Sequence, residues 1–239
     1  MSILITGSSG ILGIELKKIF SNALTPRHDE LDITKFDQVM NYLKNNKIDI
    51  LIHSAALTNV RLCEENKQLA YDVNFTGTKN LIDGLEKTNS KAKFIFISTA
   101  CVFDGHSGMY DESSIPNPEN YYSLTKLHAE NIVSQNKNNL IIRTNFVSRK
   151  KWPYPRAFMD RFGTYLFSDQ VANGIKETIE SEQNGVIHIV GEKTLSMFEL
   201  AKIYNPDIQP MTLDDYVGPK LTIDMTLDTI RWKKYSINS

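Results

Sequence analysis

The segment SILITGSSGILG, residues 2–13, decides the fold of the N-terminal part of the chain. Its first five residues form a short β-branched run, typical of a buried strand. Glycines at positions 7, 10 and 13 then lead into an amphipathic stretch over residues 11–20, which predicts a helix. Glycines let the backbone turn tightly and approach a phosphate, and a helix N-terminus offers unpaired N–H groups to it. The spacing is GxxGxxG rather than the commoner GxGxxG. We therefore expect a phosphate-binding turn here, with a purely structural turn as the alternative.

Apolar runs and helix-like segments alternate along the rest of the chain. Further strands are predicted at residues 48–56, 93–99, 139–145 and 185–190. Helices are predicted at residues 32–46, 66–88, 121–136, 169–182 and 195–204, the first capped by Asp32 or Thr34. This alternation predicts an α/β fold, a doubly wound parallel sheet of the Rossmann type. We expect residues 1–145 to form a dinucleotide-binding Rossmann domain and residues 146–239 a small C-terminal substrate-binding lobe, partly integrated with it.

The bulk composition excludes several classes of partner. The chain has 239 residues, 41% of them hydrophobic and 23% charged, as in an ordinary globular protein. A net charge of −1 gives no electrostatic basis for binding nucleic acid or a membrane surface. No apolar run reaches the roughly 20 residues of a membrane span, and the N-terminus does not resemble an export signal. The two cysteines are too few for a disulfide framework and have no metal-ligand spacing, so we expect a cytoplasmic protein without a metal site.

The stretch YYSLTK, residues 121–126, places a tyrosine and a lysine one helical turn apart, at Tyr122 and Lys126. A phenol has an unperturbed pKa of about 10, and a neighbouring ammonium lowers that pKa because it favours the phenolate. Such a phenol is suited to donate a proton to a ketone oxygen while hydride reaches the carbon. Thr99, at the end of a predicted strand, supplies a hydroxyl that can orient the carbonyl. The alternative for a lone YxxxK pattern is an exposed amphipathic helix.

A second strand of the dinucleotide-binding domain, expected within residues 22–33 before the strand at 48–56, bears on the choice of cofactor. NAD sites place an acid at the end of this strand to bind the ribose, whereas NADP sites prefer an arginine. This strand is poorly formed in NALTPRHDELDI, and Arg27 lies near its end. A guanidinium suits a 2′-phosphate, so NADPH is favoured. Asp29 and Glu30 are close enough to bind a ribose instead, which leaves NADH open.

Seven segments, taken in order, resemble the extended short-chain dehydrogenases/reductases, and most closely their dTDP-4-dehydrorhamnose reductase subgroup. These segments are GSSGILG, LDIT, HSAALTNV, VNFTGTKNL, ISTACVFDG, YYSLTKLHAE and IIRTN. The resemblance implies a catalytic trio in which Tyr122 donates the proton, Lys126 holds the nicotinamide ribose and lowers the phenol's pKa, and Thr99 orients the carbonyl. It also implies a cofactor site, to which we assign Gly7, Ser9, Gly10, Ile11, Leu12, Arg27, Asp32, Ile33, Ser54, Ala55, Ala56, Asn74, Ser98, Tyr122 and Lys126.

The resemblance implies an NAD(P)H-dependent oxidoreductase that reduces a 4-keto (deoxy) sugar nucleotide in surface-glycan biosynthesis. The expected partners are the nucleotide sugar and, as an alternative to a monomer, a second copy in a homodimer. The sequence departs from the rhamnose enzymes at Ala100 and Cys101, where aspartate and tyrosine are usual, and in its shorter substrate lobe. These departures keep two alternatives open, a catalytically silent NADP-binding regulatory subunit and a sugar-nucleotide epimerase/reductase. A set of basic and aromatic residues is a candidate diphosphate site or a basic surface loop: Arg143, Arg149, Lys150, Lys151, Trp152 and Arg156.

Overall fold

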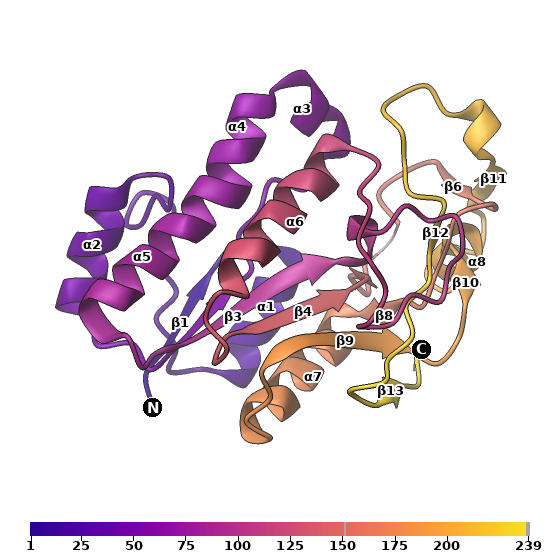
Figure 1. Ribbon diagram of the computed structural model, residues 1–239. Coiled ribbons are helices and arrows are strands. Elements are labelled where there is room, and N and C mark those ends of the chain that lie inside the picture. The colour runs from indigo at the N-terminus through magenta and orange to yellow at the C-terminus, as the bar shows by residue number, and fades with distance from the viewer. Residues whose placement is uncertain (151, 238–239) are drawn as a thin grey trace.

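The computed structural model of the protein describes residues 1–150 and 152–237, and its centre is a six-stranded parallel sheet (Figure 1). The strand order is β1-β2-β3-β4-β9-β13, and every neighbouring pair in it is parallel. The strands are β1 (Ile3–Thr6), β2 (Ile50–His53), β3 (Lys93–Thr99), β4 (Leu140–Thr144), β9 (Gly185–Gly191) and β13 (Lys234–Tyr235). The predicted doubly wound α/β fold is confirmed.

Helices cover both faces of this sheet, which explains why its strands are apolar on both sides (Figure 1). In β1, Ile3 and Ile5 pack toward α1 (Ile11–Ile19) and α7 (Ser168–Glu180), while Leu4 packs toward the other face. That second face is covered by α2 (Phe36–Asn45), α5 (Gly77–Asn89) and α6 (Tyr121–Val133). Since side chains alternate along a strand, one short run of β-branched residues contributes to two separate cores.

The chain reverses its direction of progress across the sheet at β1. After α1 it returns along the outer side of β1, where Leu24 donates its N–H to the Ile3 carbonyl and accepts from Ile5. This contact is a single bridge rather than a strand, as the poor pattern of residues 21–32 predicts. The chain then crosses through α2 to β2, on the inner side of β1. In an open α/β sheet such a switch point opens a crevice at the carboxyl ends of the strands.

One local prediction in this half was wrong. α2 begins at Phe36 with Lys35 as its N-cap, because the Asp32 carboxylate instead accepts hydrogen bonds from the N–H and hydroxyl of Thr34. The helix predicted over residues 66–88 forms without a gap as α4 (Lys67–Tyr71), the π-helical turn η1 (Asp72–Thr76) and α5, and α3 (Val60–Glu65) precedes it. Asparagine side chains cap α3 and α4 and separate them from one another.

The chain after β4 forms a small lobe and also returns to the main sheet. Its short strands are β5 (Phe146–Val147), β6 (Arg156–Phe158), β7 (Phe162–Gly163), β8 (Leu166–Phe167), β10 (Leu195–Ser196), β11 (Gln209–Met211) and β12 (Asp224–Met225). The turns η2 (Ala100–Val102) and η3 (Leu213–Asp215) and the helix α8 (Met197–Lys202) complete the described elements. β10 occupies the first two residues of the helix predicted at 195–204, where Ser196 forms a capping box with Glu199. β9 and β13 are strands of the main sheet, and α7 packs against it. The division into domains at residue 145 stays a prediction.

Candidate active site

The turn between β1 and α1 is as tight as its glycines predict. Gly7 has φ of +71°, a conformation that residues with a side chain rarely adopt. A Cβ on Gly13 would lie 2.2 Å from the Gly7 carbonyl oxygen, so α1 can begin this close to the turn with glycine at that position. At Gly10, the N-cap of α1, a Cβ would meet the Gly7 carbonyl oxygen at 3.3 Å, and the residue is exposed. The turn therefore presents bare backbone and a helix N-terminus to its surroundings, which fits a pyrophosphate.

A hollow of about 400 Å³ lies over this turn at the switch point of the sheet. It brings together the segments after β1, after Leu24 and after β2. Its lining includes these predicted cofactor-binding residues: Gly7, Ser9, Gly10, Arg27, Asp32, Ile33, Ser54, Ala55 and Ala56. The remaining lining residues are Thr6, Ser8, Pro26, His28, Leu31, Thr34 and Val73. The hollow thus combines a phosphate-binding turn with apolar walls, the combination that an adenine nucleotide requires.

Arg27 lies at the rim of this hollow, and its guanidinium is already engaged. Its Nε and Nη2 atoms donate to the two carboxylate oxygens of Asp29 at 3.0 and 2.6 Å. The Arg27 hydrogen bond holds the pKa of the Asp29 carboxyl below its usual value. Both side chains are exposed, so this bidentate pair is weak and exchangeable. A 2′-phosphate at the rim would have to displace Asp29 from Arg27.

Six predicted cofactor-binding residues lie outside the lining of the hollow, and two of them, Tyr122 and Lys126, belong to the catalytic trio. Ile11 is exposed beside Arg149, Leu12 is buried in the core under α1, and the Ser98 hydroxyl donates to Glu130 at 2.5 Å. Asn74, buried in η1, accepts from the Leu57 N–H at 2.8 Å and donates to Thr125 on α6 at 3.0 Å. Asn74 therefore connects the loop after β2 with the helix that carries the tyrosine and the lysine.

Thr99 and Tyr122 meet where β3 ends and α6 begins. Asn120 caps α6 through a bond from the Ser123 N–H, which places Tyr122 in the first turn. Burial raises the pKa of the Tyr122 phenol, and the nearby Thr99 side chain opposes this increase. The Thr99 hydroxyl also accepts from the Cys101 N–H at 3.1 Å, which fixes its position. The two hydroxyls therefore form a pair suited to bind one carbonyl oxygen.

Lys126 lies one turn further along α6 and is buried. Its Nζ donates to the Ile97 carbonyl oxygen at 2.8 Å and lies 3.9 Å from the centre of the Phe96 ring. Burial lowers the pKa of the Lys126 ammonium to about 7, against an opposing effect of Glu130. The sequence predicted that Lys126 lowers the pKa of the phenol; in this structure burial dominates and the phenol's pKa is raised. The trio nevertheless occupies one place, at the carboxyl end of β3.

A second hollow, of about 790 Å³, lies between α3 and the small lobe. Of the predicted diphosphate-binding residues, Trp152 and Arg156 line it, whereas Arg149 and Lys150 line a different hollow beside α1. Lys151 lies outside the described residues. The prediction for Arg143 was wrong, because its guanidinium is buried against the Glu130 carboxylate, with Nη2 at 2.7 Å from Oε2.

Sequence reasoning missed two arginines of this second hollow. Arg61 reaches it from α3, and Arg161 reaches it from the start of β7. Neither belongs to a local motif, and 100 positions separate them in the sequence. Together with Arg156 they give the hollow three guanidinium groups among aromatic side chains, a composition that favours a phosphorylated, ring-containing ligand.

Comparison with known proteins decides the family. The family model described as RmlD substrate binding domain matches residues 1–162. A dTDP-4-dehydrorhamnose reductase from Aggregatibacter actinomycetemcomitans is 30% identical over 226 residues, covering 83% of this chain and 76% of that protein. This chain belongs to the dTDP-4-dehydrorhamnose reductase family. The resemblance expected from the seven segments is confirmed.

Two further proteins are similar to this chain, one over most of its length and one over about half of it. The crystal structure of a dTDP-4-dehydrorhamnose reductase from Bacillus anthracis str. Ames in complex with NADP has the same fold. It is 24% identical, with a TM-score of 0.86 over 95% of this chain and 90% of that chain. The methionine adenosyltransferase 2 subunit beta of Xenopus tropicalis is 32% identical over 144 residues, which are 56% of this chain but 42% of that protein.

Ala100 and Cys101 distinguish this dTDP-4-dehydrorhamnose reductase family member next to the trio. Ala100 is fully buried, and the Cys101 sulfur lies 3.5 Å from the sulfur of Met225 in the lobe. Arg161, in turn, donates to the Met225 sulfur at 3.4 Å. A chain of contacts therefore joins Thr99, through Cys101 and Met225, to an arginine of the second hollow. Ala100, Cys101 and Met225 thus form an apolar and sulfur-rich wall next to the trio.

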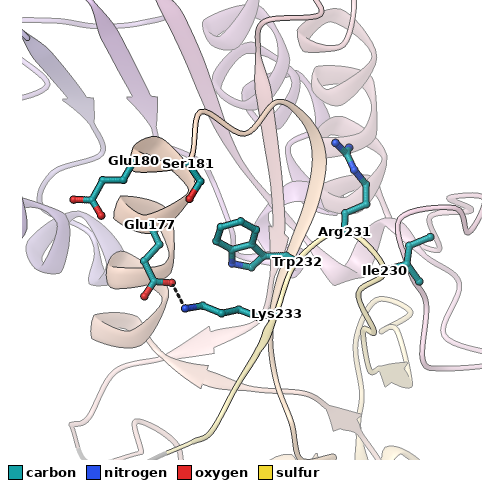
Figure 2. Close-up of a pocket in the computed structure, with 7 residues that line it drawn as sticks. All are labelled: Glu177, Glu180, Ser181, Ile230, Arg231, Trp232 and Lys233. Carbon is teal, nitrogen blue, oxygen red and sulfur yellow. Dashed lines mark ion pairs between the residues drawn. The ribbon is translucent and has the colours of Figure 1, made fainter.

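A third hollow, of about 680 Å³, lies between α7 and the segment before β13, away from the trio (Figure 2). Figure 2 shows the Trp232 indole between Glu177 and Arg231, with Lys233 paired to Glu177 at 3.0 Å.

Within residues 1–150 and 152–237, no helix has both the length and the apolar character needed to cross a bilayer. The same residues hold no group of three or more His, Cys, Asp or Glu side chains placed to bind a metal ion.

Proposed function

We propose that this protein is an NADPH-dependent oxidoreductase that reduces the 4-keto group of a deoxy-sugar nucleotide in surface-glycan biosynthesis. The observation that carries the proposal is the Thr99–Tyr122 hydroxyl pair, with Lys126 one turn away, at the carboxyl end of the parallel sheet. The glycine turn and its hollow at the same end of the sheet support a dinucleotide. The hollow with three arginines supports the nucleotide part of the substrate.

The proposed mechanism assigns one task to each member of the trio. When bound, the cofactor supplies the hydride that reduces the carbonyl carbon. Tyr122 donates its phenolic proton to the carbonyl oxygen, so the ketone becomes an alcohol and the phenol becomes a phenolate. Thr99 orients that oxygen through its hydroxyl. The protonated Lys126 stabilises the phenolate that remains, because a cation beside a phenol favours its ionised form.

The test of the proposal is oxidation of NADPH by a panel of nucleotide-linked 4-keto sugars, followed as loss of absorbance in the NADPH band. We expect turnover with at least one of them and a loss of about 10²- to 10⁴-fold in Tyr122→Phe. Tyr121→Phe is the matched control, since Tyr121 lies in the same turn of α6 but stacks with Lys67 instead. No turnover across the panel, or equal losses in the two variants, would contradict the proposal.

A second candidate is a catalytically silent NADP-binding subunit. The likeness to a methionine adenosyltransferase subunit beta and the changes at Ala100 and Cys101 favour this candidate, whereas Thr99, Tyr122 and Lys126 favour turnover. Tight NADPH binding without turnover, together with a stable complex with another protein, would decide for the silent subunit. An epimerase/reductase would instead be identified by an inverted carbon in the product.

The proposal also covers the cellular compartment and the oligomeric state of the protein. We propose the cytoplasm, on the basis of the two unpaired cysteines, Cys63 and Cys101. A homodimer stays a prediction, which sedimentation of the purified protein tests.

A further inference from the structure

A row of polar side chains lies buried in the middle of the sheet. Ser98 on β3 is in register with Arg143 on β4, and Arg143 is in register with His188 on β9. All three are at most 5% exposed. Because residues in register on neighbouring strands share one face, this row forms a polar seam in an otherwise apolar sheet.

Glu130 of α6 is the carboxylate that meets this seam, and it is 3% exposed. It accepts the Ser98 hydroxyl at 2.5 Å, and Arg143 at 3.0 Å from Nε and 2.7 Å from Nη2. With hydrogen bonds from Ser98 and Arg143 on its two oxygens, the Glu130 side chain is held in a fixed orientation. A buried ion pair such as Arg143–Glu130 often contributes less to stability than apolar side chains of similar volume would. Its presence in the sheet therefore calls for another explanation.

The position of Glu130 relative to Lys126 supplies that explanation. The two residues are one helical turn apart on the same face of α6. They bind successive residues of β3, because the Lys126 Nζ donates to the Ile97 carbonyl and Glu130 accepts the Ser98 hydroxyl. Glu130 therefore places its carboxyl group one helical turn beyond Lys126, on the side of α6 away from Tyr122, and its charge opposes the burial that lowers the pKa of Lys126.

The neighbouring elements offer Lys126 no comparable anion. The titratable side chains on the described elements around this part of α6 include His53, Cys63, Glu64, Tyr71, Asp72, Cys101, Tyr122, His128 and Arg143. His53, bonded to Thr6 and Thr78, is neutral because burial lowers its pKa to about 3. Glu64 accepts from the Tyr121 N–H, and Asp72 accepts from Gln68 at the surface. Arg143 is positive and is paired with Glu130 itself.

We infer that Glu130, fixed by Ser98 and Arg143, is the positioning residue that keeps the buried Lys126 protonated. Its catalytic meaning rests on the proposed function, because Lys126 acts on the phenolate only as a cation. The charge state of Lys126 itself can be measured without turnover. This makes a failure of the inference distinguishable from a failure of the proposed function.

The direct test titrates the protein, without substrate, by NMR of lysine labelled at Cε and Nζ, with the Lys126 signal assigned from Lys126→Met. In Glu130→Gln we expect the Lys126 midpoint to fall by about one pH unit, because an adjacent opposite charge shifts a pKa by one to three units. Ser98→Ala is the matched control, since it removes a bond to Glu130 and keeps the carboxylate. In Ser98→Ala we expect the Lys126 midpoint to stay within about 0.3 pH units of the wild-type value, because the substitution removes a neutral hydroxyl and no charge.

Glu130→Gln leaves Arg143 buried without its carboxylate and is at risk of not folding. The double variant Glu130→Gln/Arg143→Met removes both charges, and a fallen Lys126 midpoint in it supports the inference equally. An unchanged midpoint in the folded single or double variant overturns the inference. A fall in Ser98→Ala as large as that in Glu130→Gln also overturns it, because the effect would then follow from loosening of the seam rather than from charge.

A second readout applies if the protein turns over. In Glu130→Gln the alkaline loss of kcat should move to lower pH by the same amount as the Lys126 midpoint, with kcat recovered within about twofold at pH values below that midpoint. Glu130→Asp, which keeps the charge, should restore the profile. A loss of kcat that is equal at every pH would instead mean that Glu130 has a merely structural role.

Discussion

The backbone nitrogen of Ala55 lies 2.5 Å from the position that a Cβ atom on Gly7 would take. The turn after β1 and the loop after β2 therefore touch backbone to backbone, and their contact forms the floor of the hollow over the glycine turn. Both segments are at the carboxyl ends of adjacent parallel strands, where Ile5 and Ile52 are in register. At the switch point of the sheet, the contact between Gly7 and Ala55 therefore leaves no space between the two segments, and the hollow lies over them.

Gly7→Ala should abolish NADPH binding and destabilise the protein by about 2–4 kcal/mol. The variant combines a strained positive φ with a clash against backbone that cannot move aside. Gly10→Ala is the comparison, since its Cβ would meet a single oxygen at 3.3 Å and should cost far less stability. Thermal unfolding and NADPH fluorescence titration measure both effects. Equal melting temperatures for the Gly7 variant and the wild type would show that the turn adapts.

Cofactor choice should depend on the pair of Arg27 and Asp29. Arg27→Ala should raise KM for NADPH by about tenfold, since a charge-assisted bond to phosphate is lost, while KM for NADH stays nearly unchanged. Asp29→Ala should lower KM for NADPH, because it frees the guanidinium that Asp29 now occupies through two hydrogen bonds. Steady-state kinetics with the two cofactors measure this. A higher KM for NADPH in Asp29→Ala would mean that the carboxylate itself binds the cofactor.

Lys126→Met should stabilise the protein at neutral and acidic pH. The folded pKa of Lys126 is about 7 against 10.5 in the unfolded chain, so the unfolded chain binds more protons and wild-type stability rises between these two values. Lys126→Met has no ammonium to bury, so its unfolding free energy lacks this pH dependence. The amount by which the variant is more stable than the wild type is therefore largest below pH 7 and decreases toward pH 10.5. We expect a gain of roughly 1–3 kcal/mol, after loss of the bond to the Ile97 carbonyl is subtracted. Denaturant unfolding from pH 6 to pH 10 tests the direction; an advantage that grows with pH would refute it.

Thr99→Val should reduce kcat by about 10- to 10³-fold and leave NADPH binding intact. The substitution keeps the β-branched shape at the end of β3 but removes the hydroxyl that lies near Tyr122 and accepts from the Cys101 N–H. Thr99→Ser keeps the hydroxyl and should retain most of the activity. Rates and NADPH affinity measured side by side separate the two effects, and full activity in Thr99→Val would remove Thr99 from the mechanism.

Much of this protein follows from the local pattern of its sequence. The alternation of apolar runs with amphipathic segments predicted the doubly wound sheet, and three glycines in GSSGILG predicted the tight turn before α1. Helical spacing alone put Tyr122 and Lys126 on one face. These predictions succeed because side-chain period and glycine conformation are properties of a few consecutive residues. The π-helical turn η1 within the helix predicted at 66–88 escaped prediction, because such a turn leaves no periodic signal in so short a stretch.

The tertiary structure decided which side chains are free to act. Ser98 and Arg143 looked available to a ligand, yet both turn to Glu130, which 13 positions separate from Arg143 and 32 from Ser98. Arg61 and Arg161 share a hollow because the lobe folds back onto α3, and the pKa values of Tyr122 and Lys126 depend on burial. Desolvation and through-space charge depend on which distant residues surround a group. The sequence therefore determined where the chemistry is placed, and the packing of the sheet against α6 decided its protonation.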